Sequence, residues 1–172
     1  MNASWKNIFN LSYNEKWQDI ALLDLKAKLE KFHSLSRVDK YLFNEAYVRL
    51  GIMRAAILTV PFKRLVRSLT QQQEYQSIKV NDADLIMALA IGNAVRTAAN
   101  NTPWQSSCLT QVLTAQRMME KSGIGGVICI GATMDGRIID KIRAHAWLKC
   151  GDEFITGEEG HEDYPVLTSY RW

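Results

Sequence analysis

This 172-residue sequence has few cysteines, no long apolar run and little excess of either charge. Its three cysteines, Cys108, Cys129 and Cys150, are too far apart in the sequence to indicate a disulfide framework or a zinc ribbon. Their odd number indicates reduced thiols, which predicts a cytoplasmic protein. The longest charge-free apolar stretch, residues 85–95, has 11 residues, whereas about 20 are needed to span a bilayer. We therefore expect no integral membrane segment.

The composition is that of a globular chain. Lys and Arg total 21 against 18 Asp and Glu, and 47% of the residues are hydrophobic. These values exclude a disordered chain and allow a sizeable buried core. No run of Lys or Arg with interleaved aromatic residues occurs, so we expect no nucleic-acid partner. No repeat, low-complexity tract or linker rich in Gly, Pro or Ser divides the chain, and residues 1–172 are predicted to form a single domain.

The first hundred residues have a helical pattern. Apolar residues recur at helical spacing over residues 17–32. Ser36 is the expected N-cap of a second helix, which must end just before Pro61 because proline disfavours helical geometry in the residue before it. Residues 70–79 are expected to be a loop, and Asn81 is expected to cap a third helix over residues 82–99. The side chains expected on the buried side of this third helix are Ile86, Ala90, Ile91 and Ala94.

The remaining residues have a mixed pattern. Ser106 or Ser107 can cap a helix over residues 108–121. The pair Gly151-Asp152 is typical of a two-residue turn between antiparallel strands. The sequence therefore predicts an α+β fold, in which a helical portion over residues 1–100 precedes a small antiparallel sheet. The strands are expected at residues 126–133, 144–149 and 153–156.

Cys108 lies at the expected start of a helix. The unpaired N–H groups and the dipole of a helix N-terminus favour a thiolate there, and the same N–H groups can stabilise an oxyanion. His145, on an expected strand, is the candidate base. A cysteine at a helix N-terminus with a histidine on a following strand is the arrangement of papain-like and transglutaminase-like enzymes. Residues 101–172 are therefore predicted to be the catalytic portion.

The other candidate groups have simpler interpretations. Cys129 is expected to be a small buried side chain and Cys150 the last residue of a strand. His33 and His161 are expected to be structural. Cys108, Cys150, His145 and His161 do not have the close spacing of metal ligands, and the glycines at 123, 125 and 126 follow a helix instead of a strand, so we expect no metal and no bound cofactor.

At these positions the sequence resembles the transglutaminase-like leader peptidases of lasso-peptide biosynthesis, the B-type maturation proteins. The resemblance is close over residues 103–157 and looser over the helical first half. The matching segments are Pro103-Trp104, Cys108-Leu109 with Gln111, Ala115-Gln116-Arg117, Gly123-Ile124, Gly131, His145-Ala146-Trp147-Leu148 and Thr156-Gly157.

This resemblance implies a cysteine endopeptidase that removes the leader from a ribosomally made precursor peptide. A separate ATP-dependent lasso cyclase would then join the freed α-amine of the core to an Asp or Glu side chain. In that scheme Cys108 is the nucleophile and His145 the general base and later the acid, with the Cys108 N–H, helped by a group near Trp104, stabilising the oxyanion. Many members carry a fused leader-recognition domain with a strand-rich start. The helical first half predicts that this domain is missing and that a separate leader-recognition protein acts as a partner.

The family pattern commonly places an Asp about a dozen residues after the catalytic His, and no Asp stands at that place here. If the turn at Gly151-Asp152 has two residues, Cys150 pairs with Glu153 and His145 lies opposite Glu158. Glu158 is therefore our candidate for orienting His145. A shift of register by one residue would bring Gly157 or Glu159 to that place. The alternatives are Thr156, Asp152 or a backbone carbonyl.

Two other functions stay open at this point. The first is a transglutaminase-like acyl transferase, in which an amine replaces water as the acceptor of a shared acyl-enzyme. The second is a non-catalytic, peptide-binding scaffold of the maturation complex.

Overall fold

The computed structural model describes residue 30 and residues 32–72, 78–134 and 142–172. The chain divides into two compact units, residues 1–40 and residues 41–172. The helix expected over residues 17–32 lies outside the described residues, apart from residues 30 and 32. Among the described residues, no helix has the length and apolar character needed to cross a membrane.

The helices begin and end where their capping residues predict. Helix α2 (Arg37–Thr59) follows Ser36, whose Oγ accepts a hydrogen bond from the Asp39 N–H at 3.1 Å. The short helix α3 (Phe62–Leu65) starts directly after Pro61. Helix α4 (Asp82–Ala99) is capped by Asn81, whose side-chain oxygen accepts from the Asp84 N–H at 2.8 Å. Helix α5 (Cys108–Lys121) is capped by Ser107. The bounds of α2, α4 and α5 confirm three of the helices expected from the sequence.

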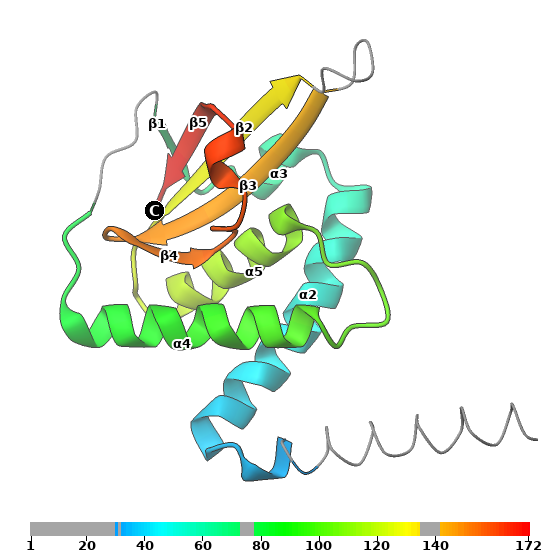
Figure 1. The fold of residues 1–172 in the computed structure, drawn as a ribbon, viewed down its shortest axis with the longest axis vertical. Helices are drawn as coiled ribbons and strands as arrows, with labels where there is room; N and C mark the ends of the chain where they lie inside the picture. Colours follow the sequence, from blue (N-terminus) through cyan, green and yellow to red (C-terminus); the bar gives the residue numbers. More distant parts are fainter. Residues whose placement is uncertain (1–29, 31, 73–77, 135–141) are drawn as a thin grey trace, which may run out of the picture. The chain divides into compact units, whose positions relative to one another are not determined.

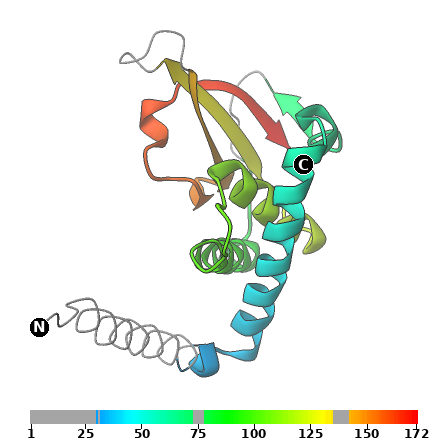
Figure 2. The same cartoon turned by 90° about the vertical axis from the view of Figure 1, so that its right-hand side faces the viewer.

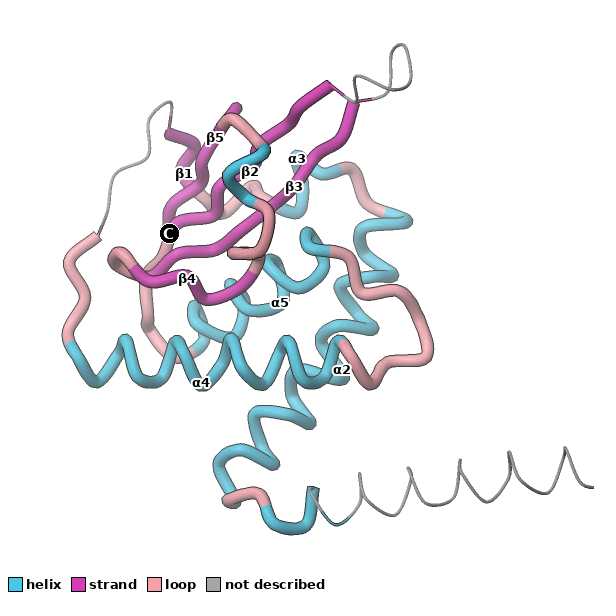
Figure 3. Tube along the Cα trace, in the orientation of Figure 1, coloured by secondary structure: helices cyan, strands magenta, loops and turns pink. Residues whose placement is uncertain are grey.

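The strands form one five-stranded antiparallel sheet in the order β1-β5-β2-β3-β4. Figure 3 shows it as the magenta segments beside the cyan helices. The sheet and the preceding helices confirm the α+β class. The strands are β1 (Thr70–Gln72), β2 (Val127–Met134), β3 (Ile142–Cys150), β4 (Glu153–Thr156) and β5 (Val166–Arg171).

Two strands correct the sequence-based prediction. Thr70–Gln72, expected to be loop, forms β1, so the first hundred residues are not helical throughout. The segment Val166–Arg171 forms β5, which was not expected. β1 pairs with β5, and β5 pairs on its other side with β2. Their stability therefore depends on long-range pairing, which a local pattern of residues does not reveal.

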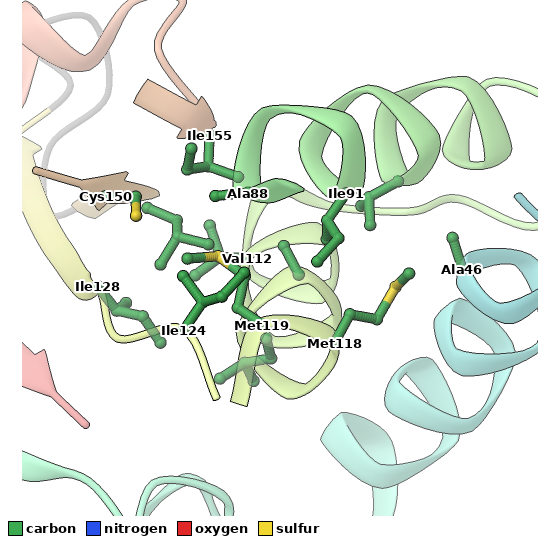
Figure 4. Close-up of a cluster of buried hydrophobic side chains, with 14 of the residues drawn as sticks. Ala46, Ala88, Ile91, Val112, Met118, Met119, Ile124, Ile128, Cys150 and Ile155 are labelled. Atoms are coloured by element: carbon green, nitrogen blue, oxygen red, sulfur yellow. The ribbon is translucent and has the colours of Figure 1, made fainter. Parts of the chain in front are cut away.

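Helix α5 is the centre of the larger unit. It lies between α4 and one face of the sheet, as Figures 1 and 2 show for residues 41–172. Its buried residues include Val112, Leu113, Met118 and Met119, all at most 2% exposed. Figure 4 shows how side chains from α2, α4, α5 and the sheet meet around it. This packing fixes the N-terminus of α5, and therefore Cys108, against the sheet.

The buried side of α4 differs from the one expected. Ile86 is 68% exposed, whereas Ala88, Ile91, Gly92, Val95 and Ala98 are buried. Ile91 is buried as expected, and Ala90 and Ala94, also expected on this side, are half-buried and pack against the core. Gly92 lies against β4, because a Cβ there would come within 2.4 Å of the Ile155 carbonyl oxygen. A glycine and alanines let α4 approach the sheet closely, and they share the packed face with Ile91 and Val95.

Candidate active site

Cys108 is the first residue of α5 and is half-buried. The Ser107 side chain accepts a hydrogen bond from the Thr110 N–H at 3.4 Å, and its carbonyl accepts from the Gln111 N–H at 3.0 Å. The N–H groups of Cys108 and Leu109 belong to the first turn, which has no intrahelical acceptors for them. Two backbone donors and the positive end of the helix dipole therefore lie beside the sulfur, as the sequence predicts.

The other two cysteines have a different environment. Cys129 is 1% exposed, and burial raises the pKa of its thiol to about 11. Cys150 is fully buried; burial, followed by the negative charge of Asp84, raises the pKa of its thiol. Both lie on strands, as expected for structural side chains. Cys108 is therefore the accessible thiol of the three.

The loop before Cys108 is held by side chains on either side of it. Arg54 on α2 donates a hydrogen bond to the Gln105 carbonyl at 2.7 Å, and Gln111 on α5 donates to the Ser106 carbonyl at 3.0 Å. Trp104 packs against Tyr47, with 5.7 Å between the ring centroids. Its buried Nε1 has no hydrogen-bond partner within the described part of the chain. These contacts position the start of α5 from α2.

His145 lies on β3 opposite Gly131 of β2. Its Nε2 is 2.8 Å from the backbone carbonyl oxygen of Gly157. Because a carbonyl can only accept, Nε2 is the donor and carries the hydrogen, which leaves Nδ1 of the neutral ring free to accept a proton. The imidazole also stacks on Trp147, at 6.0 Å and 24°, and lies 5.3 Å from the ring of Tyr164.

Cys108 and His145 line the same cavity, of about 220 Å³. The cavity lies where α3 and the N-terminus of α5 approach the middle of β2 and β3. Apolar side chains make up most of its wall, so it can hold an apolar group next to the thiol. The lining residues are Phe62, Cys108, Leu109, Ile130, Ala144, His145 and Ala146.

The two side chains do not meet in this structure. Along β3, Ala146 packs in the core around α5, whereas Trp147 belongs to a separate cluster with Val127 and Cys129 on the other face of the sheet. The His145 ring, stacked on Trp147, lies on that second face. Among the described residues, no hydrogen bond joins the sulfur of Cys108 to His145. The fold thus brings both residues to one cavity but leaves their reactive atoms unpaired.

The register of the β3–β4 hairpin corrects one step of the sequence argument. Cys150 pairs with Glu153 and Lys149 with Phe154, as the two-residue turn predicts. A bulge then intervenes, so that Leu148 pairs with Thr156, and β4 ends there. The expected pairing of His145 with Glu158 assumed an unbroken ladder, and that assumption is wrong.

The hydrogen-bond acceptor of His145 is thus a backbone group. The Glu158 carboxylate makes no hydrogen bond to His145 among the described residues, and the Glu158 carbonyl instead lies 2.6 Å from His161 Nδ1. Gly157 supplies the acceptor from a left-handed conformation, with φ of +77°. A backbone carbonyl was one of the alternatives left open by the sequence. Which backbone carbonyl accepts the hydrogen bond depends on the bulge, and no residue type in the sequence predicts that bulge.

Tyr164 is a neighbour of His145 that sequence reasoning missed. It directly follows the short 3-10 helix η2 (His161–Asp163), in the loop that leads to β5, and its ring lies beside His145 on the second face of the sheet. A Cβ at position 131 would come within 2.6 Å of the Tyr164 carbonyl oxygen. Gly131, which belongs to the motif identified in the sequence, therefore makes room for this loop.

The described residues contain no group of three or more His, Cys, Asp or Glu side chains that could hold a metal ion. Comparison with protein families matches residues 56–169 to the transglutaminase-like superfamily. This match covers well over half of the chain and includes both Cys108 and His145. The chain belongs to the transglutaminase-like superfamily. Comparison with curated proteins and with solved structures gave no significant match.

Membership in this superfamily of thiol enzymes agrees with the arrangement of the site. It indicates an activity of the cysteine-protease or acyltransferase kind. The superfamily match begins within α2 and ends within β5, so it covers all of β1 and most of β5, the two strands that the sequence did not predict. The substrate is a separate question.

Proposed function

We propose that this protein is a cysteine endopeptidase that removes the leader from a lasso-peptide precursor. The observation that carries the proposal is the shared cavity of Cys108, at the N-terminus of α5, and His145, on β3. The motif segments around both residues support the choice of substrate, because they resemble those of lasso-peptide leader peptidases. The reaction takes place in the cytoplasm, where the precursor is made.

In the proposed reaction, His145 takes the thiol proton of Cys108 on a ring nitrogen, and the sulfur attacks the carbonyl carbon of the last leader residue. The N–H groups of the first turn of α5 stabilise the oxyanion. The C–N bond then breaks, and the imidazolium returns the proton to the amine of the core. Water attacks the thioester, releasing the leader as a carboxylic acid and restoring the thiol.

The separation of the reactive atoms bears on how the enzyme works. Because His145 and Cys108 lie on opposite faces of the sheet, β3 must turn over locally at His145, which gives up its contacts with Trp147 and Tyr164, before the ring can reach the sulfur. Catalytic hydrogen bonds are often long in free enzymes and tighten when the substrate binds. We therefore propose that the pair forms when the precursor and its partners bind. Those partners are a separate leader-recognition protein and the ATP-dependent cyclase that uses the product.

The placement of His145 also favours a second candidate, a peptide-binding scaffold without catalysis. A scaffold needs the cavity but not the Cys–His pair. The two candidates differ in one readout, because only the enzyme loses its function when Cys108 is replaced by Ala.

The test combines the protein, the precursor and the leader-recognition protein in water enriched in heavy oxygen, and the products are weighed by mass spectrometry. We expect cleavage that Cys108→Ala and His145→Ala each abolish, with one heavy oxygen in the leader carboxylate. A leader joined to an added amine would identify an acyl transferase. Unchanged cleavage with Cys108→Ala would refute the proposal, and complex formation without cleavage would establish the scaffold.

A further inference from the structure

One side of β3 is unpaired next to the cavity. On that side β4 pairs only with Leu148, Lys149 and Cys150 and then ends at Thr156. On the other side β2 pairs with β3 from Ile142 to Lys149. Within the described part of the chain, no strand pairs with the outer side of residues 142–147. Gly157 lies beside Ala146 and Trp147, so residues 142–145 of β3 form the open sheet edge.

The backbone groups of Ala144 point to this open edge. Cys150 and Glu153 flank a two-residue turn, so they exchange both backbone hydrogen bonds, and the N–H and C=O of Cys150 point toward β4. Every second residue along β3 points the same way, which includes Ala146 and Ala144. Gly157 lies against the carbonyl of Ala146. Ala144 is exposed and makes the next donor and acceptor pair on the edge.

The face of the sheet beside this edge is an apolar strip that continues into the cavity. Ala144 lies opposite Ala132, and beyond them Ile142 lies opposite Met134. Ile142 and Met134 are 69% and 73% exposed. All four share the face of Ala146, which packs toward α5. The strip therefore leads from an exposed apolar pair to the thiol of Cys108.

We infer that an extended segment of the peptide substrate binds as an added strand on the open edge of β3. This inference rests on the proposed function, and it names how that site holds its substrate. The backbone of the segment pairs with Ala144, and the side chain opposite Ala144 points into the cavity beside Cys108. The side chain two residues away lies over Ile142 and Met134, so this position favours an apolar residue.

The probe is acetyl-tetra-alanyl chloromethyl ketone, which alkylates a thiolate with loss of chloride. Backbone pairing does not depend on side chains, so this probe is sufficient. Its rate of reaction with Cys108 is followed by peptide mass spectrometry and divided by the rate with iodoacetamide, which is too small to pair with an edge. A series of probes carries one N-methyl group at each successive amide.

We expect an alternating result. N-methylation of the amides that face β3 should lower the normalised rate about tenfold, because the methyl group removes one hydrogen bond and collides with the strand edge. Methylation of the amides between them should change the normalised rate less than about twofold. Ala144→Pro, which removes the edge N–H, should lower the rate for the unmethylated probe by a similar factor. Division by the iodoacetamide rate of the same variant corrects for any change in the reactivity of the Cys108 thiol.

Three outcomes would each overturn the inference. N-methylation could lower the normalised rate equally at all amides, it could lower it at none, or Cys108 could fail to react with the probe. If Ala144→Pro fails to fold, the N-methyl series on the parent protein decides alone. The proposed function is judged separately by Cys108-dependent cleavage of the precursor. Cleavage without alternation refutes only the added strand, and alternation without cleavage refutes only the peptidase.

Discussion

Replacing Gly157 by Ala tests the group that holds His145. Gly157 has φ of +77°, and a Cβ there would come within 2.4 Å of the Ala146 carbonyl oxygen and 2.9 Å of the Trp147 Cα. An alanine in the left-handed region costs about 1 kcal/mol, because its Cβ approaches the following carbonyl. The overlap with β3 costs a further 1 to 3 kcal/mol, roughly, because both neighbouring atoms belong to the backbone and cannot turn away. We expect Gly157→Ala to lower the free energy of unfolding by about 2 to 4 kcal/mol.

Gly160→Ala is the matched control. Gly160 has φ of +74°, but nothing lies within 4 Å of its Cβ position, so only the cost of the left-handed conformation, about 1 kcal/mol, is expected. Urea unfolding of both variants, followed by circular dichroism, gives the difference. Nitrogen NMR of His145 should also show that Nε2 no longer carries the hydrogen exclusively in Gly157→Ala. Equal losses of stability in the two variants would refute the contact between Gly157 and β3, and with it the backbone acceptor of His145.

Three further predictions concern the thiols and the groups around the site. Iodoacetamide at pH 9 should label Cys108 well before Cys129 and Cys150, because a thiol with a pKa of about 11 is only about one part in a hundred thiolate at that pH; early labelling of Cys129 in the folded protein would contradict its burial. Glu158→Gln should keep the rate of precursor cleavage within about twofold of the parent protein, since His145 bonds to a backbone carbonyl. A loss of activity as large as that of Cys108→Ala would show that the Glu158 carboxylate acts in the reaction. Thr156→Val should keep or raise the free energy of unfolding by up to about 1 kcal/mol, because the buried Thr156 hydroxyl has no hydrogen-bond partner among the described residues; a loss above 1 kcal/mol in urea unfolding would reveal a hidden partner.

The sequence by itself determined the features that depend on neighbouring residues. Ser36, Asn81 and the pair Ser106-Ser107 predicted the starts of three helices, because a cap acts on N–H groups two or three residues away; the structure selects Ser107 from that pair. The pair Gly151-Asp152 predicted the β3–β4 turn for the same local reason. Since α5 starts at Cys108, the sequence also placed the candidate nucleophile at a helix N-terminus.

Only the tertiary structure decided what depends on distant segments. β1 forms because it pairs with β5, and β5 forms because it pairs with both β1 and β2. Ile86 is exposed because α4 packs through the face that holds Gly92 and Ile91. A bulge in β4 replaced the expected Glu158 by the carbonyl of Gly157 as the partner of His145. One extra residue in a strand changes which side chains lie opposite one another along a hairpin. Whether such a bulge is stable depends on how the strand packs against the helices beneath the sheet. The sequence therefore named the two candidate catalytic residues, while the fold decided that they border one cavity and that the histidine ring is held on the other face of the sheet.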